Sequence, residues 1–250
     1  MTTDVTTLDI YAQYADAGVS DVGSTECGIP SFILLQANSP QVDEGLGRGG
    51  QFFCTTTSEA TAELTILPVA RDHEFIEWAP RSTGLGVIKR HSPTSQVVVD
   101  ARAETPFGKI TLPNGNALVE TFTLYVIAIG DGGAITPGVI RFASTQIAAY
   151  KSIAARAGSM MLKLPDGRTA RYPWFAHAWS LKAAKKVKKE NSWYVITPSL
   201  VGGTPEAARA AVSPDALAAA AQMYDAYRAG GLKVGQDAEA AHNSDEEAPF

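Results

Sequence analysis

The chain has 250 residues, of which 45% are hydrophobic, and a formal net charge of −5. It is long enough to form one large domain or two small ones around a hydrophobic core. It contains no apolar run of about 18 residues, which a transmembrane helix needs, and residues 1–7 lack the basic and apolar regions of a secretory signal. We therefore expect a cytosolic protein.

The two cysteines, Cys27 and Cys54, are too few for a disulfide framework, and a reducing cytosol keeps them as thiols. They lie too far apart for the short Cys–Cys spacing that zinc sites favour, although His73 and His91 could complete such a site on paper. We expect unpaired structural thiols, with no metal ion and no cofactor.

The charged residues are strongly segregated along the chain. Residues 1–66 carry nine acids and one base, whereas residues 141–194 carry eleven bases and two acids, a net charge of +9. Residues 237–250 carry five acids and no base. A block of this charge within an acidic protein indicates a polyanionic partner, with the protein's own acidic segments as a substitute.

The first part of the chain contains a polar arm, a hydrophobic run and a glycine-rich loop. Residues 1–28 are rich in Thr, Asp and Gly, which predicts a partly mobile arm. Residues 29–36 are the first firm hydrophobic segment. The loop at residues 45–50 is not expected to bind a nucleotide, because such a loop follows a strand and opens a helix. Here the β-rich residues 51–57 follow, which favours a hairpin or surface loop.

The middle of the chain is rich in strand signals. Residues 74–80 alternate with the period of two that is typical of a strand. Residues 117–129 are long, β-branched and aromatic, and they follow Asn114-Gly115, the strongest short hairpin signal. We expect them to form a central strand. The strands predicted in this region are residues 62–70, 74–80, 86–90, 107–112, 117–129 and 139–142.

The basic block begins with a helix and a hairpin. Residues 144–146 can cap a helix that runs to about residue 157. Asp166-Gly167 then marks the turn of a small hairpin between residues 162–164 and 169–172.

The last part of the chain combines lysines, strands and a helix. Residues 173–181 and 192–198 are predicted to be strands on either side of residues 182–189, which hold five lysines. An Ala-rich helix is predicted over residues 204–230, broken near Ser213-Pro214 and ended by two glycines. The residues that follow have no core-forming pattern and are expected to be disordered.

These elements predict a mainly β fold. Strands do not alternate with long helices, so a doubly wound α/β fold is disfavoured. An OB-like Greek-key barrel with insertions, one internal helix and a C-terminal helix fits best. The expected organisation is a partly mobile arm at 1–28, an OB-like nucleic-acid-binding domain at 29–200, a helical segment at 201–231 and a disordered acidic tail at 232–250.

Aromatic and basic side chains are concentrated in residues 172–194, which contain three of the four tryptophans. Bases stack on aromatic rings without sequence preference, and lysines neutralise phosphates in a salt-dependent way. This combination predicts binding of single-stranded nucleic acid. The expected DNA-binding residues are Lys151, Arg171, Trp174, Phe175, Trp179, Lys182, Lys185, Lys186, Lys188, Lys189, Trp193 and Tyr194, extended by Phe53, Trp78 and Arg81.

Each of these assignments has a structural alternative. Side chains alternate along a strand, so half of the aromatics belong to a core, and core packing is favoured for Trp78. The lysine run is compatible with a solvated loop. Catalysis is poorly supported, because Asp72, Glu74 and Glu77 alternate like a solvated strand face, and the isolated histidines have no nucleophile motif beside them. We expect no enzyme activity.

The C-terminal tip, residues 245–250, has the sequence Asp-Glu-Glu-Ala-Pro-Phe. It resembles the acidic tip of single-stranded DNA-binding proteins, which typically ends in acidic residues, Pro and Phe. The resemblance implies a tail that recruits replication and recombination proteins, and it is also expected to cover the basic block when DNA is absent. The tail residues implied are Asp245, Glu246, Glu247, Pro249 and Phe250.

A second resemblance, to a family of tailed-phage proteins, spans roughly residues 29–198. It implies single-stranded DNA-binding proteins with an OB-like core that act in replication or recombination in the bacterial host cytoplasm. The family pattern has basic residues directly after Ser-Thr-Gln, whereas Ala148, Ala149 and Tyr150 stand here, which puts a DNA role for this helix start in doubt. The segments that carry the resemblance are residues 29–42, Glu77-Trp78 with the Gly-rich loop after it, residues 142–147 and Asn191-Ser192-Trp193-Tyr194.

The sequence therefore predicts a non-enzymatic protein that coats single-stranded DNA. Two alternatives stay open: a strand-annealing recombination mediator, and a structural or assembly protein whose basic block binds an acidic partner. A metal-dependent nuclease ranks last. A homodimer and a preference for RNA also stay open, and no membrane contact is expected.

Overall fold

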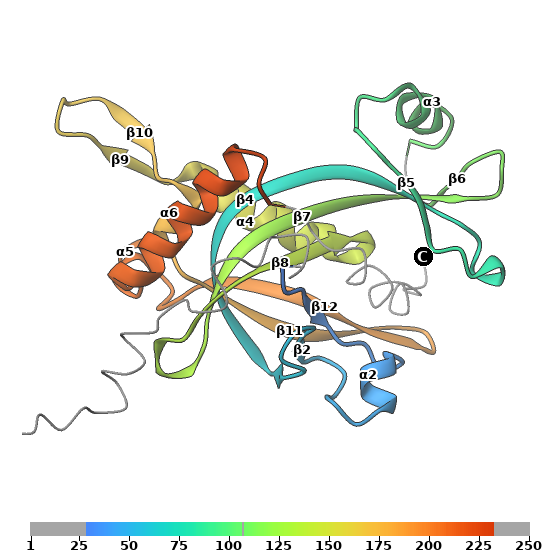
Figure 1. Cartoon of the computed structure of the whole chain (residues 1–250), viewed down its shortest axis with the longest axis horizontal. Coiled ribbons are helices and arrows are strands. Elements are labelled where there is room, and N and C mark those ends of the chain that lie inside the picture. The colour runs from blue at the N-terminus through green and yellow to red at the C-terminus, as the bar shows by residue number, and fades with distance from the viewer. Residues whose placement is uncertain (1–28, 107, 233–250) are drawn as a thin grey trace, which may run out of the picture.

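The computed structural model describes residues 29–106 and 108–232, with the side chain of Arg81 left out. Its strand ladders are antiparallel, and a seven-stranded sheet is the largest sheet in this part of the chain (Figure 1). The mainly β fold predicted from the sequence is therefore confirmed. The expected arm at residues 1–28 and the acidic tail from residue 233 onward lie outside the described residues.

The strands are β1 (Phe32–Leu34), β2 (Phe52–Cys54), β3 (Ala60–Thr61), β4 (Glu63–Trp78), β5 (Val87–His91), β6 (Ile110–Thr111), β7 (Ala117–Ile129), β8 (Ile135–Ala143), β9 (Met161–Lys163), β10 (Thr169–Arg171), β11 (Trp179–Lys188) and β12 (Asn191–Leu200). The helices are α2 (Pro40–Asp43), α3 (Gln96–Glu104), α4 (Ile147–Ser159), α5 (Pro205–Ala210) and α6 (Pro214–Arg228), with 3-10 turns η1 (Arg81–Thr83), η2 (Asp131–Gly133), η3 (Ser144–Gln146) and η4 (Trp174–Ala176).

Two long strands, β4 and β7, form the centre of the large sheet. They pair along almost their whole length. On its other side β4 pairs with β11 at one end and with β5 at the other, and β7 pairs in the same way with β8 and β6. The prediction of a central strand at residues 117–129 is confirmed. The predicted turn is also present, and Gly115 adopts a φ of 84° there, which favours glycine.

The sequence predicts two strands at residues 62–70 and 74–80, whereas the structure has the single strand β4. The polar residues 71–73 do not interrupt it, because they continue the ladder opposite β7. The register shifts between Pro68 and Ala70, which marks a β-bulge. The extra residue, Val69, has no partner in β7 and reverses the alternation of side chains beside Pro68. A search for a strict period of two therefore divides this strand into two shorter ones.

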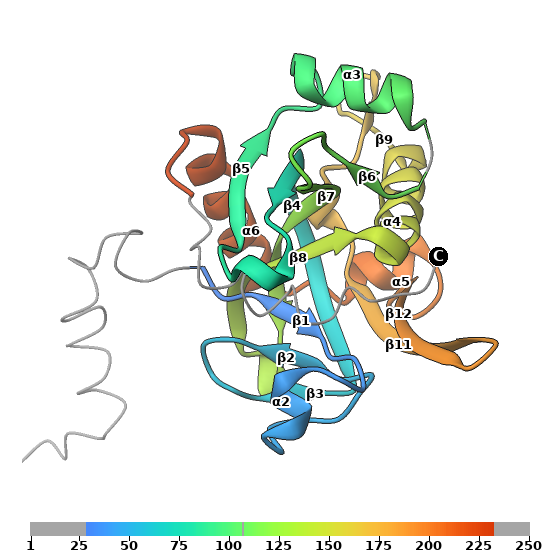
Figure 2. The ribbon, with the colours of Figure 1, turned by 90° about the vertical axis from the view of Figure 1, so that its right-hand side faces the viewer.

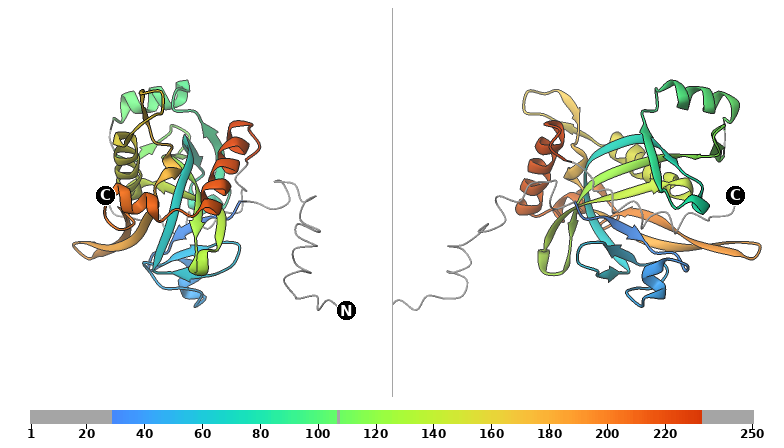
Figure 3. Two further views of the ribbon diagram at one scale, coloured as in Figure 1. Left: turned by 90° about the vertical axis from the view of Figure 1, so that its left-hand side faces the viewer. Right: turned by 45° about the vertical axis from the view of Figure 1, so that its right-hand side comes forward.

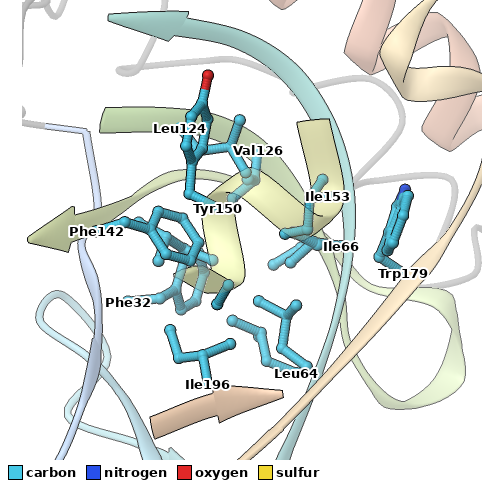
Figure 4. Packing of buried hydrophobic residues seen from close by; sticks show 14 of the residues in the cluster. Phe32, Leu64, Ile66, Leu124, Val126, Phe142, Tyr150, Ile153, Trp179 and Ile196 are labelled. Carbon is cyan, nitrogen blue, oxygen red and sulfur yellow. The ribbon is translucent and has the colours of Figure 1, made fainter. Parts of the chain in front are cut away.

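The large sheet is buried on both faces. On one face, Ile66, Leu124 and Phe142 pack with residues of α4, β1 and β2 (Figure 4). On the other face, Leu67 and Ile127 pack with residues of α6. Figure 2 shows α4 and α6 on opposite sides of the sheet. Burial on both faces explains why the middle of β7 is apolar at successive positions.

The two C-terminal helices are capped and anchored. The side chains of Thr204 and Ser213 accept backbone hydrogen bonds at the starts of α5 and α6, and a proline follows each cap. The predicted break near Ser213-Pro214 is thus confirmed. Near the end of α6, the Tyr227 hydroxyl lies 2.8 Å from Asp72 Oδ1, and the Tyr125 hydroxyl donates to Asp72 Oδ2 at 2.9 Å. This shared carboxylate ties α6 to the sheet.

Helix α3 was not predicted, because its Val97-Val98-Val99 run is a strand-type signal. In the helix only Val98 of these three is buried, and it packs with Phe75 and Leu118 on the sheet. Val97 and Val99 are exposed. Tertiary packing of one small apolar face therefore overrides the local preference.

The described strands do not close into a barrel. The large sheet runs from β12 through β11, β4 and β7 to β6, and no pairing joins its two ends. The OB-like Greek-key topology and the proposed domain boundaries stay predictions. Within residues 29–106 and 108–232, no helix combines the length and the hydropathy that a membrane span requires.

Candidate nucleic-acid interface

The lysine-rich segment is one strand of a long hairpin, which we call the lysine hairpin (residues 179–200). β11 and β12 pair over the ten residues of each strand. β4 pairs with β11 only as far as Lys182, so the rest of the hairpin continues as a two-stranded ribbon (Figures 1 and 3). The alternative of a solvated loop at residues 182–188 is wrong, because each of these residues pairs with β12.

One face of the lysine hairpin carries most of its charge. Lys186 pairs directly with Trp193, and Lys182 and Lys188 point to the same side because residues two apart on a strand share a face. The three lysines are exposed and the Trp193 side chain is half-buried. Side chains that pair directly across two antiparallel strands lie within reach of each other. We call this arrangement the Trp193 face.

The opposite face of the lysine hairpin continues the hydrophobic core. Tyr194 pairs with Lys185 on the side that carries Trp179 and Leu181 nearer the sheet. Lys185 is exposed, whereas Tyr194 packs against the core. Lys189 lies in the turn with a φ of 55°. The five lysines predicted to act together are therefore divided between two faces and a turn.

Lys182 already has an acidic partner. Its Nζ atom lies 3.1 Å from Glu63 Oε2, and the Ser180 hydroxyl donates to Glu63 Oε1 at 2.6 Å. The hydrogen bond from Ser180 and then that from Lys182 lower the pKa of Glu63. A phosphate that binds Lys182 has to compete with this carboxylate. Lys186 and Lys188 form no ion pair with any of the described residues, so they are the more available phosphate ligands.

Three predicted stacking residues belong to the core instead. Trp179 is 1% exposed, Phe53 is 5% exposed and Trp78 is 8% exposed. A ring that is enclosed on both faces cannot accept a base, so we exclude these three residues from the interface. This outcome follows from the alternation of strand side chains, which assigns part of an aromatic-rich segment to the core.

Residues 173–181 were predicted as one strand, but they begin with the 3-10 turn η4, and the strand starts only at Trp179. Trp174 and Phe175 are half-buried and pack against the two core clusters on either side of the sheet. The Phe175 ring centroid lies 6.2 Å from that of Tyr224 on α6. These two aromatics support the start of the hairpin and are not part of its projecting end.

The remaining basic residues do not form one groove with the lysine hairpin. Lys151 is exposed on α4, and Arg171 is exposed on the small β9–β10 hairpin together with Lys163. The two hairpins project from different parts of the molecule (Figures 1 and 3). Arg141 is buried on β8, and burial lowers its pKa to about 10. The basic block of the sequence is thus distributed over separate surfaces.

Two glutamines bind the outer edge of β12, and we call them the glutamine clamp (Gln36 and Gln146). Gln36 Nε2 donates to the Tyr194 carbonyl oxygen at 3.1 Å, and the Tyr194 N–H donates to Gln36 Oε1 at 2.7 Å. Gln146 Nε2 donates to the same carbonyl at 2.9 Å, and the Ile196 N–H donates to Gln146 Oε1 at 2.8 Å. Neither glutamine was predicted to contact β12, and Gln146 was included only in the helix cap predicted at residues 144–146. The available signal was that both lie in segments with a phage-family resemblance.

The Tyr194 ring lies against a pair of glycines in the loop after α2. A Cβ atom added to Gly49 would lie 2.8 Å from the ring, and one added to Gly50 would also lie 2.8 Å from it. Both distances are too short for ordinary van der Waals contact. The Tyr194 ring therefore needs glycine at these two positions of the loop at residues 45–50. This packing explains the glycines without a bound nucleotide.

The acidic residues of β4 were predicted to be a solvated face, but Glu77 is buried. It accepts hydrogen bonds from Asn116 at 2.6 Å and Asn114 at 3.1 Å, and it lies 2.8 Å from His91 Nε2. The Asn116 hydrogen bond is the largest of the interactions that lower the pKa of Glu77. Glu74 is half-buried and pairs with an arginine of β5. These groups stabilise the far end of the sheet.

Both histidines considered as zinc ligands have carboxylate partners. His73 Nε2 lies 3.0 Å from Glu120 Oε1, and the His73 ring stacks on Phe122 with a centroid distance of 4.1 Å. The His91 ring pairs with the Glu77 carboxylate, as described above. Cys54 is a free, buried thiol on β2. The tail residues Asp245 to Phe250 and the Arg81 side chain lie outside the described atoms.

Comparison with known proteins identifies one family. Residues 3–233 match the family model described as Pam3 phage gp34-like protein. No curated protein and no solved structure matches the chain. The match spans well over half of the chain and includes all of the described sheet.

Proposed function

The chain belongs to the Pam3 phage gp34-like family, and we propose that it binds single-stranded DNA without sequence specificity. Bases stack on Trp193, and phosphates contact the exposed lysines of the lysine hairpin. The family supports a phage origin and a place of action in the infected bacterium. The DNA-binding activity is inferred from the chemistry of the hairpin.

One observation carries the proposal: Trp193 pairs with Lys186 on the exposed ribbon, with Lys188 beside it. A base that stacks on the indole brings its phosphate within range of mobile ammonium groups. Stacking contributes roughly 1–3 kcal/mol per base and tolerates any base, because every base has a π-face. Phosphate neutralisation adds affinity that falls steeply with salt.

The same proposal includes two parts that rest on the sequence. The large antiparallel sheet, which is covered on both faces, serves as an OB-like support for the hairpin, and the strand of nucleic acid binds along the projecting ribbon. The acidic, Phe-terminated tail recruits replication and recombination proteins, and it competes with DNA for the lysines. Removal of residues 237–250 is therefore expected to tighten DNA binding at low salt.

Titration of the intrinsic tryptophan fluorescence with oligo-dT at low salt tests the binding. We expect quenching that weakens as salt is added. Replacement of Lys186 and Lys188 by Gln should reduce affinity strongly, whereas the control pair Lys163→Gln and Arg171→Gln on the β9–β10 hairpin should reduce it little. Absence of both quenching and a mobility shift in the unchanged protein refutes the proposal.

Two further measurements separate the alternatives. Annealing of complementary strands faster than passive coating allows indicates a recombination mediator that uses the same surface. Binding to an acidic protein that excess oligo-dT does not displace indicates an assembly protein. In both assays the Lys186 and Lys188 variant shows whether the lysine hairpin is responsible.

A further inference from the structure

We propose that Gln36 and Gln146 are positioning residues for nucleic-acid binding: they fix β12 so that Trp193 and the lysines keep one orientation. This inference rests on the proposed function, because it assigns a role in that function to residues that contact no DNA. It also gives a common role to three segments that are far apart in the chain: the segment after β1, the turn before α4, and β12.

The clamp replaces a neighbouring strand along part of β12. β12 pairs with β11 on one side only, so the backbone groups on its other side require different partners. The Gln36 amide satisfies both the N–H and the C=O of Tyr194, as an adjacent strand residue would. Gln146 bridges the Tyr194 carbonyl and the Ile196 N–H. Pro198 lies at the same parity as these residues, so its missing N–H falls on this open edge.

Both glutamines are themselves held in place. Gln36 is 8% exposed, and its backbone N–H donates to the Ser39 hydroxyl at 2.8 Å. Gln146 ends the 3-10 turn that leads into α4, and Tyr150 and Ile153 of that helix are buried in the core. The clamp thus connects the hairpin to two rigid parts of the core.

The position of the clamp determines what it controls. It acts at Tyr194, the residue next to Trp193, at the point where β11 and β12 have left the support of β4. The Tyr194 ring packs against the glycine pair at Gly49 and Gly50, which further restricts rotation of the strand. A ribbon without these restraints twists freely, and the indole then loses part of its orientation before DNA arrives. Preorganisation of this kind increases affinity without adding a contact.

Gln36→Ala and Gln146→Ala, singly and together, test the inference, with Gln96→Ala on the exposed part of α3 as the matched control. Amide hydrogen exchange should accelerate at Tyr194 in Gln36→Ala, at Ile196 in Gln146→Ala and at both positions in the double variant, and it should not change in the control. We expect oligo-dT affinity to fall about threefold to tenfold per variant, since each loses hydrogen bonds of modest net strength. The slope of log affinity against log salt should stay unchanged, because every lysine remains.

The outcomes are distinct. Faster exchange at the amide that has lost its acceptor, together with unchanged affinity, overturns the positioning role and leaves the proposed function intact. A changed salt slope also overturns it, because that result indicates lost phosphate contacts. If the unchanged protein does not bind oligo-dT, the proposed function and this inference both fail. If the double variant does not fold, Gln146→Ala alone decides, because it leaves both hydrogen bonds between Gln36 and Tyr194 in place.

Discussion

Trp193 and Tyr194 are adjacent in the chain, and their rings lie on opposite faces of β12. Trp193 pairs with Lys186 on the charged face, whereas Tyr194 pairs with Lys185 and packs against the core. In the proposed function, Trp193 therefore stacks on a base while Tyr194 fixes the strand. This division of roles makes the contribution of each residue separable by mutation.

Trp193→Ala is expected to weaken oligo-dT binding by roughly 1–3 kcal/mol, because a stacking platform is lost. Trp193→Phe should keep part of the affinity and remove most of the fluorescence quenching. Fluorescence anisotropy of a labelled oligonucleotide measures both variants without relying on the tryptophan signal. Trp174→Phe is the control, and equal affinities of Trp193→Ala and the unchanged protein contradict the prediction.

Lys186→Gln with Lys188→Gln is expected to reduce the salt slope of binding by about 1.4, if each lysine neutralises one phosphate of a single strand. Lys182→Gln on the same face should change the slope less, because Glu63 already neutralises part of that charge. Affinities measured over a series of salt concentrations give the slopes. If Lys182→Gln changes the salt slope as much as each of the other two substitutions does, the ion pair between Lys182 and Glu63 opens when DNA binds.

Tyr227→Phe is expected to destabilise the fold by about 1 kcal/mol, since it removes the hydroxyl that binds the Asp72 carboxylate near the end of α6. Burial, followed by the interactions with Asp72, raises the pKa of Tyr227 to about 12. A tyrosine in the unfolded chain ionises near pH 10. The contribution of the Tyr227 hydroxyl to the free energy of unfolding is therefore fully present below about pH 10. It is lost as the pH rises toward the pKa of Tyr227 in the folded protein.

Urea denaturation of Tyr227→Phe and the unchanged protein at several pH values measures this effect. The stability difference should be constant near neutral pH and should narrow above about pH 10. A difference that widens over that range contradicts the assignment. DNA affinity at neutral pH should not change, because α6 packs on β4 and β7 away from the ribbon.

Glu77→Ala is expected to destabilise the fold by about 3 kcal/mol, because it leaves the buried His91 without its carboxylate partner and removes the hydrogen bonds from Asn114 and Asn116. The lowered pKa of Glu77 means that its contribution is present above the ordinary carboxyl pKa and is lost as pH falls through the folded value. The difference from the unchanged protein should therefore shrink in acid. Chemical denaturation at neutral and acidic pH measures it, and a difference that grows in acid refutes the assignment.

Local signals in the sequence predicted much of the fold. The hairpin at Asn114-Gly115 and the helix break at Ser213-Pro214 depend on residues within a few positions of each other, so they can be recognised without the tertiary structure. The unbroken strand β4 and the helix α3 could not be predicted in this way. The first depends on a bulge that forms only opposite β7, and the second depends on the burial of Val98 against the sheet.

The candidate site was predicted in composition and not in arrangement. The sequence has lysines and tryptophans in one segment, but which of them share a face depends on the register between β11 and β12. The glutamine clamp is even harder to predict from the sequence, because Gln36 and Tyr194 are 158 residues apart in the chain. A side-chain amide that substitutes for a strand leaves no periodic pattern. The burial of Trp179, in contrast, agrees with the alternation of strand side chains, which places part of an aromatic-rich segment in the core.

The glutamine clamp is built from uncharged amides, and this has a consequence for how the protein responds to its surroundings. Added salt screens the lysines and weakens their attraction for phosphate, but it leaves amide–backbone hydrogen bonds essentially intact. Changes in pH around neutrality also leave amides unaltered. Under the proposed function, ionic conditions would therefore adjust the attraction for DNA while the clamp keeps the hairpin in one shape, so that a hairpin released from one strand is ready for the next.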